Sequence, residues 1–208
     1  MTNQTPYFTS LTDLAAARLG GKVLSANDEF FAEKENLILP GRGIFIPDKY
    51  TDRGKWMDGW ETRRRRTPGH DWCIIQLAAP GKISGFDIDT NHFLGNHPPF
   101  ASVDASEGVT SSYPLTSEDW QNLTWTEILP KSPLQPGSQN IFQISSEKTW
   151  THLRLNIHPD GGVARFRAYG RVVRQFEKGE EIDLAAAING GRAILCNDMF
   201  FSHMSNIN

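Results

Sequence analysis

Hydrophobic and polar residues alternate along several short segments of this chain, which is the pattern of β-strands that have one buried face. Glycine and proline residues lie between these segments, at positions where turns are expected. Six segments carry the strand pattern: residues 72–77, 83–90, 125–129, 140–145, 152–158 and 164–169. Many short strands separated by turns favour a mainly β fold, an antiparallel β-sandwich or jelly roll.

Turn residues predict how some of these strands end. The apolar run 72–77 precedes Pro80-Gly81, so we expect a buried strand that ends in a turn there. Segments 152–158 and 164–169 flank Pro159-Asp160-Gly161-Gly162, which predicts a β-hairpin with a solvated polar face.

Helix is predicted only over residues 11–18. Thr12 could cap this alanine-rich stretch, and Gly20-Gly21 would end it.

The chain also repeats part of its own sequence. The segment that begins Asp13-Leu-Ala-Ala-Ala returns at Asp183-Leu-Ala-Ala-Ala, an offset of 170 residues, and 12 of 26 positions are identical. A unit of this length has the size of a domain. We therefore predict a complete module over residues 1–175 and the truncated start of a second copy over 183–208. Without a core of their own, the apolar residues of the second copy should be poorly ordered or pack on another surface. These residues are Ala185 to Ala187, Ile194, Leu195, Phe200 and Phe201.

Composition narrows the classes of partner. The net charge of −3 and the pI near 6.1 give no electrostatic reason to expect nucleic acid or an acidic membrane as partner. The N-terminus has no apolar signal core, and Cys73 and Cys196 are too few for a secreted disulfide framework. These features predict a cytoplasmic protein, with self-association into a homo-oligomer left open.

The densest cluster of polar and aromatic residues spans positions 52–71. Guanidinium groups in this cluster could clamp an anion while tryptophans exclude water. Its candidate residues are Trp56, Asp58, Trp60, Glu61, Arg63, Arg65 and His70. If the arginine run 63–66 is extended, at most two of its side chains point into one site. The alternative is a solvated basic stretch beside aromatic core residues.

A second cluster follows the strand pattern at 83–90. Asp87 and Asp89 share one face of that strand, and His92, Asn96 and His97 follow in a loop. Such a set could supply an acid–base pair or ligate a divalent metal, but it lacks the spacing of a specific metal motif. We predict no cofactor and leave a divalent metal open. The alternative is a surface strand with a hydrogen-bonded loop.

Several motifs together resemble the allantoicase family, which hydrolyses allantoate in purine breakdown. The most specific is Lys55-Trp-Met-Asp-Gly-Trp-Glu-Thr-Arg-Arg-Arg-Arg66, and similar matches cover 20–24, 27–37, 69–75 and 85–96. The resemblance implies tandem jelly-roll modules related to galactose-binding-like domains, and hydrolysis of allantoate to ureidoglycolate and urea.

This reaction needs a cationic anchor for the substrate carboxylate, acceptors for ureido N–H groups, and a group that moves a proton. On chemical grounds Arg63 or Arg65 would hold the carboxylate. Glu61 or Asp58 would bind ureido nitrogens, and His92 or His70 would shuttle the proton. Trp56, Trp60, Asp87, Asp89 and Asn96 complete the predicted binding set. The rival prediction is a catalytically silent module that only binds a ligand, or a fragment.

Overall fold

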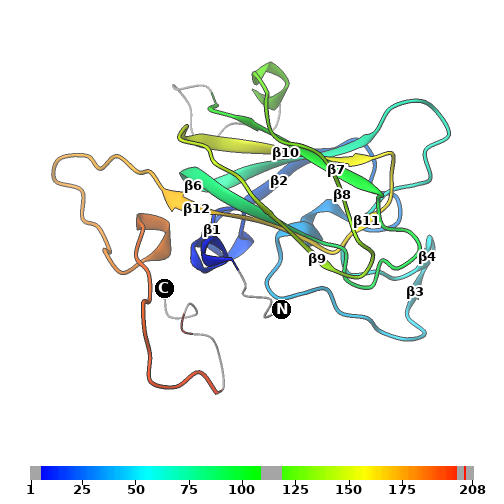
Figure 1. Cartoon of the computed structure of the whole chain (residues 1–208), viewed down its shortest axis with the longest axis horizontal. Helices are drawn as coiled ribbons and strands as arrows, with labels where there is room; N and C mark the ends of the chain where they lie inside the picture. Colours follow the sequence, from blue (N-terminus) through cyan, green and yellow to red (C-terminus); the bar gives the residue numbers. More distant parts are fainter. Residues whose placement is uncertain (1–5, 109–118, 201–203, 205–208) are drawn as a thin grey trace.

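The computed structural model describes residues 6–108, 119–200 and 204, and its sheets consist of antiparallel strands (Figure 1). The strands are β1 (Thr12–Asp13), β2 (Lys22–Ala26), β3 (Tyr50–Thr51), β4 (Gly54–Lys55), β5 (Trp60–Glu61), β6 (Asp71–Asp89), β7 (Phe100–Ser106), β8 (Thr126–Pro133), β9 (Gln139–Gln143), β10 (Trp150–His158), β11 (Gly162–Val163) and β12 (Arg165–Val172). Short 3-10 turns connect them: η1 (Tyr7–Ser10), η2 (Ala17–Leu19), η3 (Lys34–Ile38), η4 (Asp119–Asn122) and η5 (Ala187–Asn189). None of the helical elements in these ranges is long and apolar enough to cross a membrane.

The long strand β6 belongs to both layers of a sandwich. Its first half pairs with β2 on one side and β10 on the other, and β7 and β8 extend that layer. Its second half lies between β9 and β12, and β1 pairs with β12 at the edge. The fold is therefore the antiparallel β-sandwich that the sequence pattern predicts.

The core lies between the two layers. Alternate residues of β6 face it, including Cys73 and Ile75 from the first half and Phe86 and Ile88 from the second. Phe86 stacks on Phe166 of β12, with ring centroids 5.5 Å apart. Burial of large apolar side chains of this kind contributes roughly 1.5–3 kcal/mol each to folding. The strand periodicity therefore selects the core residues correctly.

The predicted turn at Pro80-Gly81 is wrong. β6 runs through both residues, and the oxygen of Pro80 accepts a hydrogen bond from the nitrogen of Val173. A side chain at Gly81 would come within 2.5 Å of the Cδ1 atom of Leu14, so glycine allows the close approach where the strand passes between layers.

The predicted hairpin of residues 152–158 with 164–169 is also wrong. Both strands form, but β10 pairs with the first half of β6 and β12 pairs with the second half. The polar face of β10 is not solvated either. His152 and Asn156 are buried, and the Arg154 guanidinium donates to Asp104 and lies over the ring of Trp125.

The predicted helix over residues 11–18 is wrong, because this stretch forms β1 and the start of η2. Asp13 explains the difference, because its carboxylate accepts hydrogen bonds from the nitrogens of Ala15 and Ala168. These bonds hold the chain on the edge of β12. Gly20, at φ 103°, ends the η2 turn as predicted.

The second copy of the repeated segment adopts the same local turn as the first. In both copies the aspartate side chain accepts from the second residue after it, at Ala15 and Ala185, and a left-handed glycine ends the turn, at Gly20 and Gly190. Beyond this turn the copies differ. Leu14 is buried in the core, whereas the equivalent Leu184 is 78% exposed.

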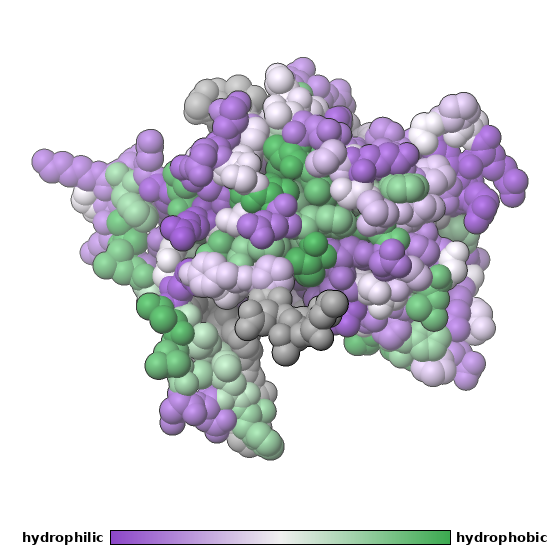
Figure 2. Space-filling model, viewed as in Figure 1, coloured by the Kyte–Doolittle hydropathy of each residue, from purple (hydrophilic) through white to green (hydrophobic). Residues whose placement is uncertain are grey.

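Most of the residues from 191 to 200 in the second copy are exposed. Ile194 and Leu195 are exposed, and Figure 2 shows apolar residues gathered on the C-terminal segment that projects from the body. By contrast, Ala187 is buried, and nearby Arg192 donates to the oxygen of Ser10. Phe201 and Asn206 lie outside the described residues.

Candidate active site

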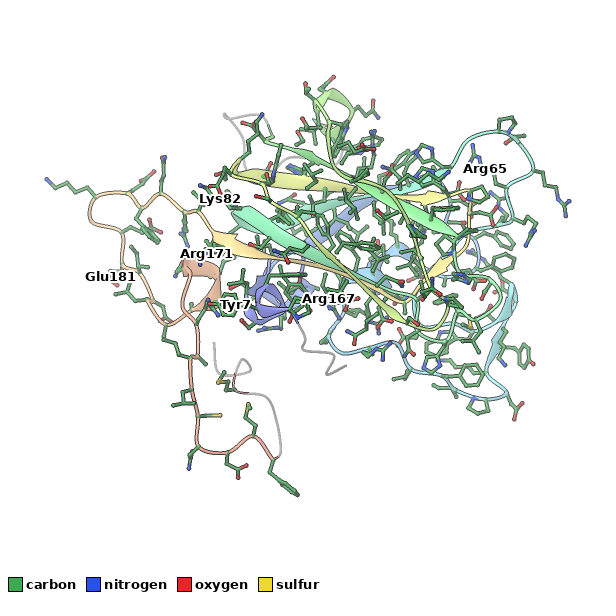
Figure 3. All side chains as sticks on the ribbon, viewed as in Figure 1. Tyr7, Arg65, Lys82, Arg167, Arg171 and Glu181 are labelled. Atoms are coloured by element: carbon green, nitrogen blue, oxygen red, sulfur yellow. The ribbon has the colours of Figure 1, made fainter. Side chains whose placement is uncertain are left out.

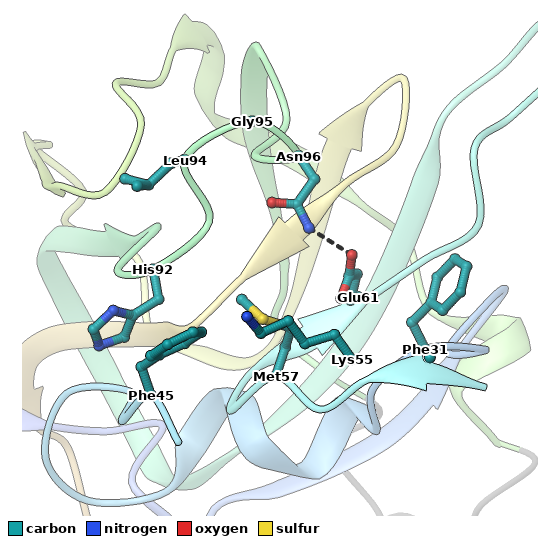
Figure 4. Close-up of a pocket in the computed structure, with 10 residues that line it drawn as sticks. Phe31, Phe45, Lys55, Met57, Glu61, His92, Leu94, Gly95 and Asn96 are labelled. Atoms are coloured by element: carbon teal, nitrogen blue, oxygen red, sulfur yellow. Dashed lines mark hydrogen bonds between the residues drawn. The ribbon is translucent and has the colours of Figure 1, made fainter. Parts of the chain in front are cut away.

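Two loops meet beside strand β5 and line an open cavity of about 360 Å³ (Figure 4). One loop runs from residue 43 through the β3–β4 hairpin to β5, and the other spans residues 90–98, after β6. The cavity is lined by Phe31, Phe45, Gly54, Lys55, Met57, Glu61, His92, Leu94, Gly95 and Asn96. Three predicted site residues, Glu61, His92 and Asn96, therefore lie in one cavity.

Glu61 is held in place by its backbone and its side chain. Strand β5 pairs with β11, where Glu61 lies opposite Gly162, and its backbone also exchanges hydrogen bonds with Ala32. The Nδ2 atom of Asn96 donates to the Oε1 atom of Glu61 at 2.6 Å. Burial raises the pKa of Glu61, and the Asn96 bond opposes this shift. The result is a partly desolvated carboxyl group with one fixed amide partner.

His92 enters the cavity from a constrained loop. Its backbone has a φ of 67°, in the left-handed region that residues other than glycine adopt rarely. The preceding Asn91 fixes the loop, since its nitrogen donates to Asp89 and its Nδ2 atom donates to the oxygen of Gly43. The ring of His92 lies 5.7 Å from that of Phe45. Both loops thus position the imidazole.

Lys55 is a cation in this cavity that the sequence analysis did not select. Its ammonium lies 4.4 Å from the centroid of the Phe45 ring and makes no ion pair with a carboxylate in the described parts of the chain. Figure 4 shows its end between the Glu61–Asn96 pair and the His92–Phe45 pair. The turn signal Asp52-Arg53-Gly54 could have revealed it, because a tight hairpin there brings Lys55 back toward β5.

Asp58 supports the cavity from outside. Its carboxylate accepts two hydrogen bonds from the Nη2 atom of Arg165, at 2.9 and 2.8 Å, and one from the nitrogen of Ile44. Both side chains are largely buried. Asp58 therefore holds the loop next to Phe45 and is committed to an ion pair.

The two tryptophans of the same motif lie outside the cavity lining. Trp60 is fully buried in the core and donates from Nε1 to the oxygen of Asp28 at 2.8 Å. Trp56 is half-buried beneath the Lys49 ammonium, 3.6 Å from the ring centroid. Their contacts are those of packing residues.

Asp89 is buried and paired. The Nε and Nη2 atoms of Arg42 donate to its two oxygens at 2.7 and 2.8 Å, and the nitrogen of Asn91 donates to it as well. It thereby connects β6 to both loops of the cavity. Its place in the predicted binding set stays a prediction, and its observed contacts position the His92 loop.

Asp87 of the same strand is a buried carboxylate without an ion-pair partner of its own in the described structure. Burial raises its pKa to about 6, the Gln139 hydrogen bond lowers it, and neighbouring Asp89 raises it further. Its Oδ1 atom is buried without a hydrogen-bond partner in the described structure. Because the folded chain holds this proton more tightly than the unfolded chain, this group lowers the free energy of unfolding as pH rises from about 4 to about 6.

Asp87→Asn is therefore expected to stabilise the protein at neutral pH. A pKa about two units above the ordinary value corresponds to about 3 kcal/mol in the free energy of unfolding, which the amide would recover above pH ~6. Urea denaturation near pH 7.5 and near pH 4 measures this difference. The gain should shrink at the lower pH, where the wild-type carboxyl is protonated. An equal gain at both pH values, or an equal effect of the exposed control Asp52→Asn, would contradict the assignment.

The predicted arginines line a different cavity, also of about 360 Å³. Arg63 pairs with Asp28 at 2.6 Å, and Arg65 pairs with Asp71 at 2.7 Å. His70 lies apart from the first cavity as well, with its ring 4.7 Å from that of His158. Their predicted catalytic and binding roles stay predictions, but the structure does not bring them together with Glu61 and His92.

The donor set gives no sign of a resident metal. No group of three or more histidine, cysteine, aspartate or glutamate side chains in the described ranges could hold a metal ion. The polar groups of the first cavity are one ammonium, one carboxyl, one imidazole and one amide.

The sandwich with its loop-borne cavity is an all-β domain of the galactose-binding-like class. One structural relative of this class is a family 32 carbohydrate-binding module from a glycoside hydrolase of Clostridium perfringens, with a TM-score of 0.51 and 14% identity over 81% of this chain and 99% of that one. This likeness concerns the fold alone.

A more specific relationship follows from the sequence. The allantoicase repeat model matches residues 12–173, so the chain belongs to the allantoicase repeat family. A probable allantoicase of Pseudomonas aeruginosa is 45% identical over 203 residues, which cover 96% of this chain and 59% of the relative. The crystal structure of allantoicase from Saccharomyces cerevisiae superimposes with a TM-score of 0.79 at 36% identity, over 96% of this chain and 61% of that one. The chain thus spans about three-fifths of the length of these relatives.

Proposed function

We propose that this chain takes part in the hydrolysis of allantoate to ureidoglycolate and urea, and that the cavity beside β5 binds the substrate. The observation that carries the proposal is the convergence of Lys55, Glu61, His92 and Asn96 on one cavity in a member of this family. These four side chains offer one group for each task that the reaction requires.

Lys55 is the proposed anchor of the substrate carboxylate. Among the residues that the structure describes, its ammonium makes no ion pair with a carboxylate, whereas Arg63 and Arg65 are already paired with aspartates in another cavity. A charge-assisted hydrogen bond from the ammonium would fix the carboxylate and orient the α-carbon between the remaining groups.

Glu61 and Asn96 would hold a ureido group. A carboxylate accepts hydrogen bonds from ureido N–H groups, and an amide can donate to the ureido oxygen. The hydrogen bond between Glu61 and Asn96 fixes the orientation of both before the substrate binds. Met57 lines the same cavity and offers an apolar surface beside these polar groups.

His92 is the proposed proton carrier. The bond that breaks joins the α-carbon to one ureido nitrogen, and the electron pair leaves with that nitrogen, which takes a proton from the imidazolium and departs as urea. The remaining ureido nitrogen stabilises the electron-deficient carbon. Water adds to that carbon, and its released proton returns to the imidazole, so that ureidoglycolate forms and His92 is regenerated.

The direct test is to incubate the chain with allantoate and assay urea release, with calorimetric titration of the same ligand beside it. Turnover would support the proposal. Binding without turnover would support the rival function, a silent ligand-binding module. If the chain neither binds nor hydrolyses allantoate, both functions are contradicted.

Lys55→Gln is expected to raise KM for allantoate by roughly 10- to 100-fold and to change kcat little. The loss of a hydrogen bond to a charged group costs about 1.5–3 kcal/mol, and this contact forms with the ground state and the transition state alike. Steady-state kinetics measures both constants. Lys178→Gln removes an equal charge at an exposed position outside the cavity and should leave KM unchanged. A fall in kcat at constant KM would contradict the anchoring role.

A further inference from the structure

The four consecutive arginines have two different structural roles. Residues 63–66 have no helical structure and line the second cavity. Arg63 and Arg65 bind Asp28 and Asp71, which are themselves fixed by further bonds: the nitrogen of Phe30 donates to Asp28, and Asn27 donates to Asp71. These two arginines are therefore neutralised, and they tie the segment to the loop after β2 and to the first residue of β6.

Arg64 and Arg66 have no partner among the residues that the structure describes. Both are exposed, both line the cavity, and neither makes a hydrogen bond or ion pair within the described residues. The hydroxyl of neighbouring Thr67 is also unengaged there and lines the same cavity. Four guanidinium groups and two carboxylates give the lining a net charge of +2.

We propose that this cavity binds a compact oxyanion with two negative charges, of the phosphate class. A dianion matches the charge of the lining. Residues two apart in an extended segment are separated by roughly 6.6 Å, so two guanidinium forks can grip one anion from two sides. The forks and the Thr67 hydroxyl together offer more donors than the two oxygens of a carboxylate can use, whereas a phosphate group presents three terminal oxygens.

This site is separate from the cavity proposed for allantoate. The two cavities share no lining residue, and Phe31 lines the first while Asp28 lines the second. The proposed anion site therefore does not depend on the proposed hydrolysis, and each can be tested without the other. Its occupant would be either free phosphate or the head of a phosphate monoester.

The test is calorimetric titration of the whole chain with inorganic phosphate, with glycerol phosphate and with acetate, at constant ionic strength because salt screens exposed charges. We expect saturable binding of the two phosphates with a Kd on the order of 1 mM and at least tenfold weaker binding of acetate. Tighter binding of glycerol phosphate would identify a monoester as the natural ligand, and tighter binding of inorganic phosphate would identify the free anion.

The double variant R64Q/R66Q should weaken phosphate binding at least tenfold and leave the thermal unfolding midpoint unchanged. R171Q is the matched control, because Arg171 is an exposed arginine at the opposite end of the molecule from Arg65 (Figure 3). It should bind phosphate as the wild type does. Unsaturable binding in the wild type, equal affinity in R64Q/R66Q, or equal affinity for acetate and phosphate would overturn the proposal.

Discussion

His92→Asn is expected to lower kcat for urea release by about 100- to 10,000-fold, the usual contribution of a positioned general acid or base. Asparagine tolerates the left-handed backbone at this position better than most residues do, so the loop should keep its conformation. KM should change little, because the imidazole acts on a proton that moves in the transition state. Added imidazole should restore part of the activity by taking the vacant position beside Phe45.

His70→Asn is the matched control for this prediction. It removes the same group from a histidine that contacts His158 instead of the cavity, and turnover should persist. If His70→Asn abolished turnover while His92→Asn preserved it, the proton carrier would be assigned to the wrong loop. Rescue of His92→Asn by imidazole separates a chemical role from a structural one, since a misfolded loop would not respond.

Asp58→Asn is expected to lower the free energy of unfolding by about 3–5 kcal/mol, because it leaves the buried guanidinium of Arg165 without a charged partner. The same change weakens the hydrogen bond from the nitrogen of Ile44, so the loop that carries Phe45 should loosen. Urea denaturation gives the stability, and hydrogen exchange at residues 43–46 reports the loop.

The control for this loss is Glu147→Gln, which breaks the exposed pair with Lys82. A surface ion pair contributes about 0–1 kcal/mol, so this variant should remain near wild-type stability. A loss below about 1 kcal/mol for Asp58→Asn would show that the Arg165 pair is solvated and that it does not hold the cavity loop.

Sequence reasoning located β6, β8, β9, β10 and β12 because alternation depends only on which side chains one strand buries, but it missed β2 and β7. It did not find their partners, because the pairing of β10 and β12 depends on the passage of β6 between the layers. That passage rests on a tertiary contact, the approach of Gly81 to Leu14, which no local signal encodes. By contrast, the turn after Asp13 is encoded locally, since it forms again after Asp183 where the neighbouring residues have no sheet partner.

The candidate site was predictable to a similar extent. Three residues of the predicted set, Glu61, His92 and Asn96, line one cavity, and their chemical roles stay predictions. The ion pairs of Arg63 and Arg65 were not predictable, because their partners Asp28 and Asp71 lie elsewhere in the chain. Asp58 looked like a free carboxylate for the same reason, since its partner Arg165 is distant in sequence.

The sharing of β6 between the two layers has a consequence for unfolding. If either layer opens, it removes pairing from the same continuous strand, so the layers cannot melt as independent units. The protein should therefore unfold in one cooperative transition, and the amide protons of β6 should exchange only through global opening. The loops of residues 43–58 and 90–98 lie outside that strand, so side-chain contacts such as the Asp58–Arg165 pair, and not pairing with β6, hold them to the scaffold.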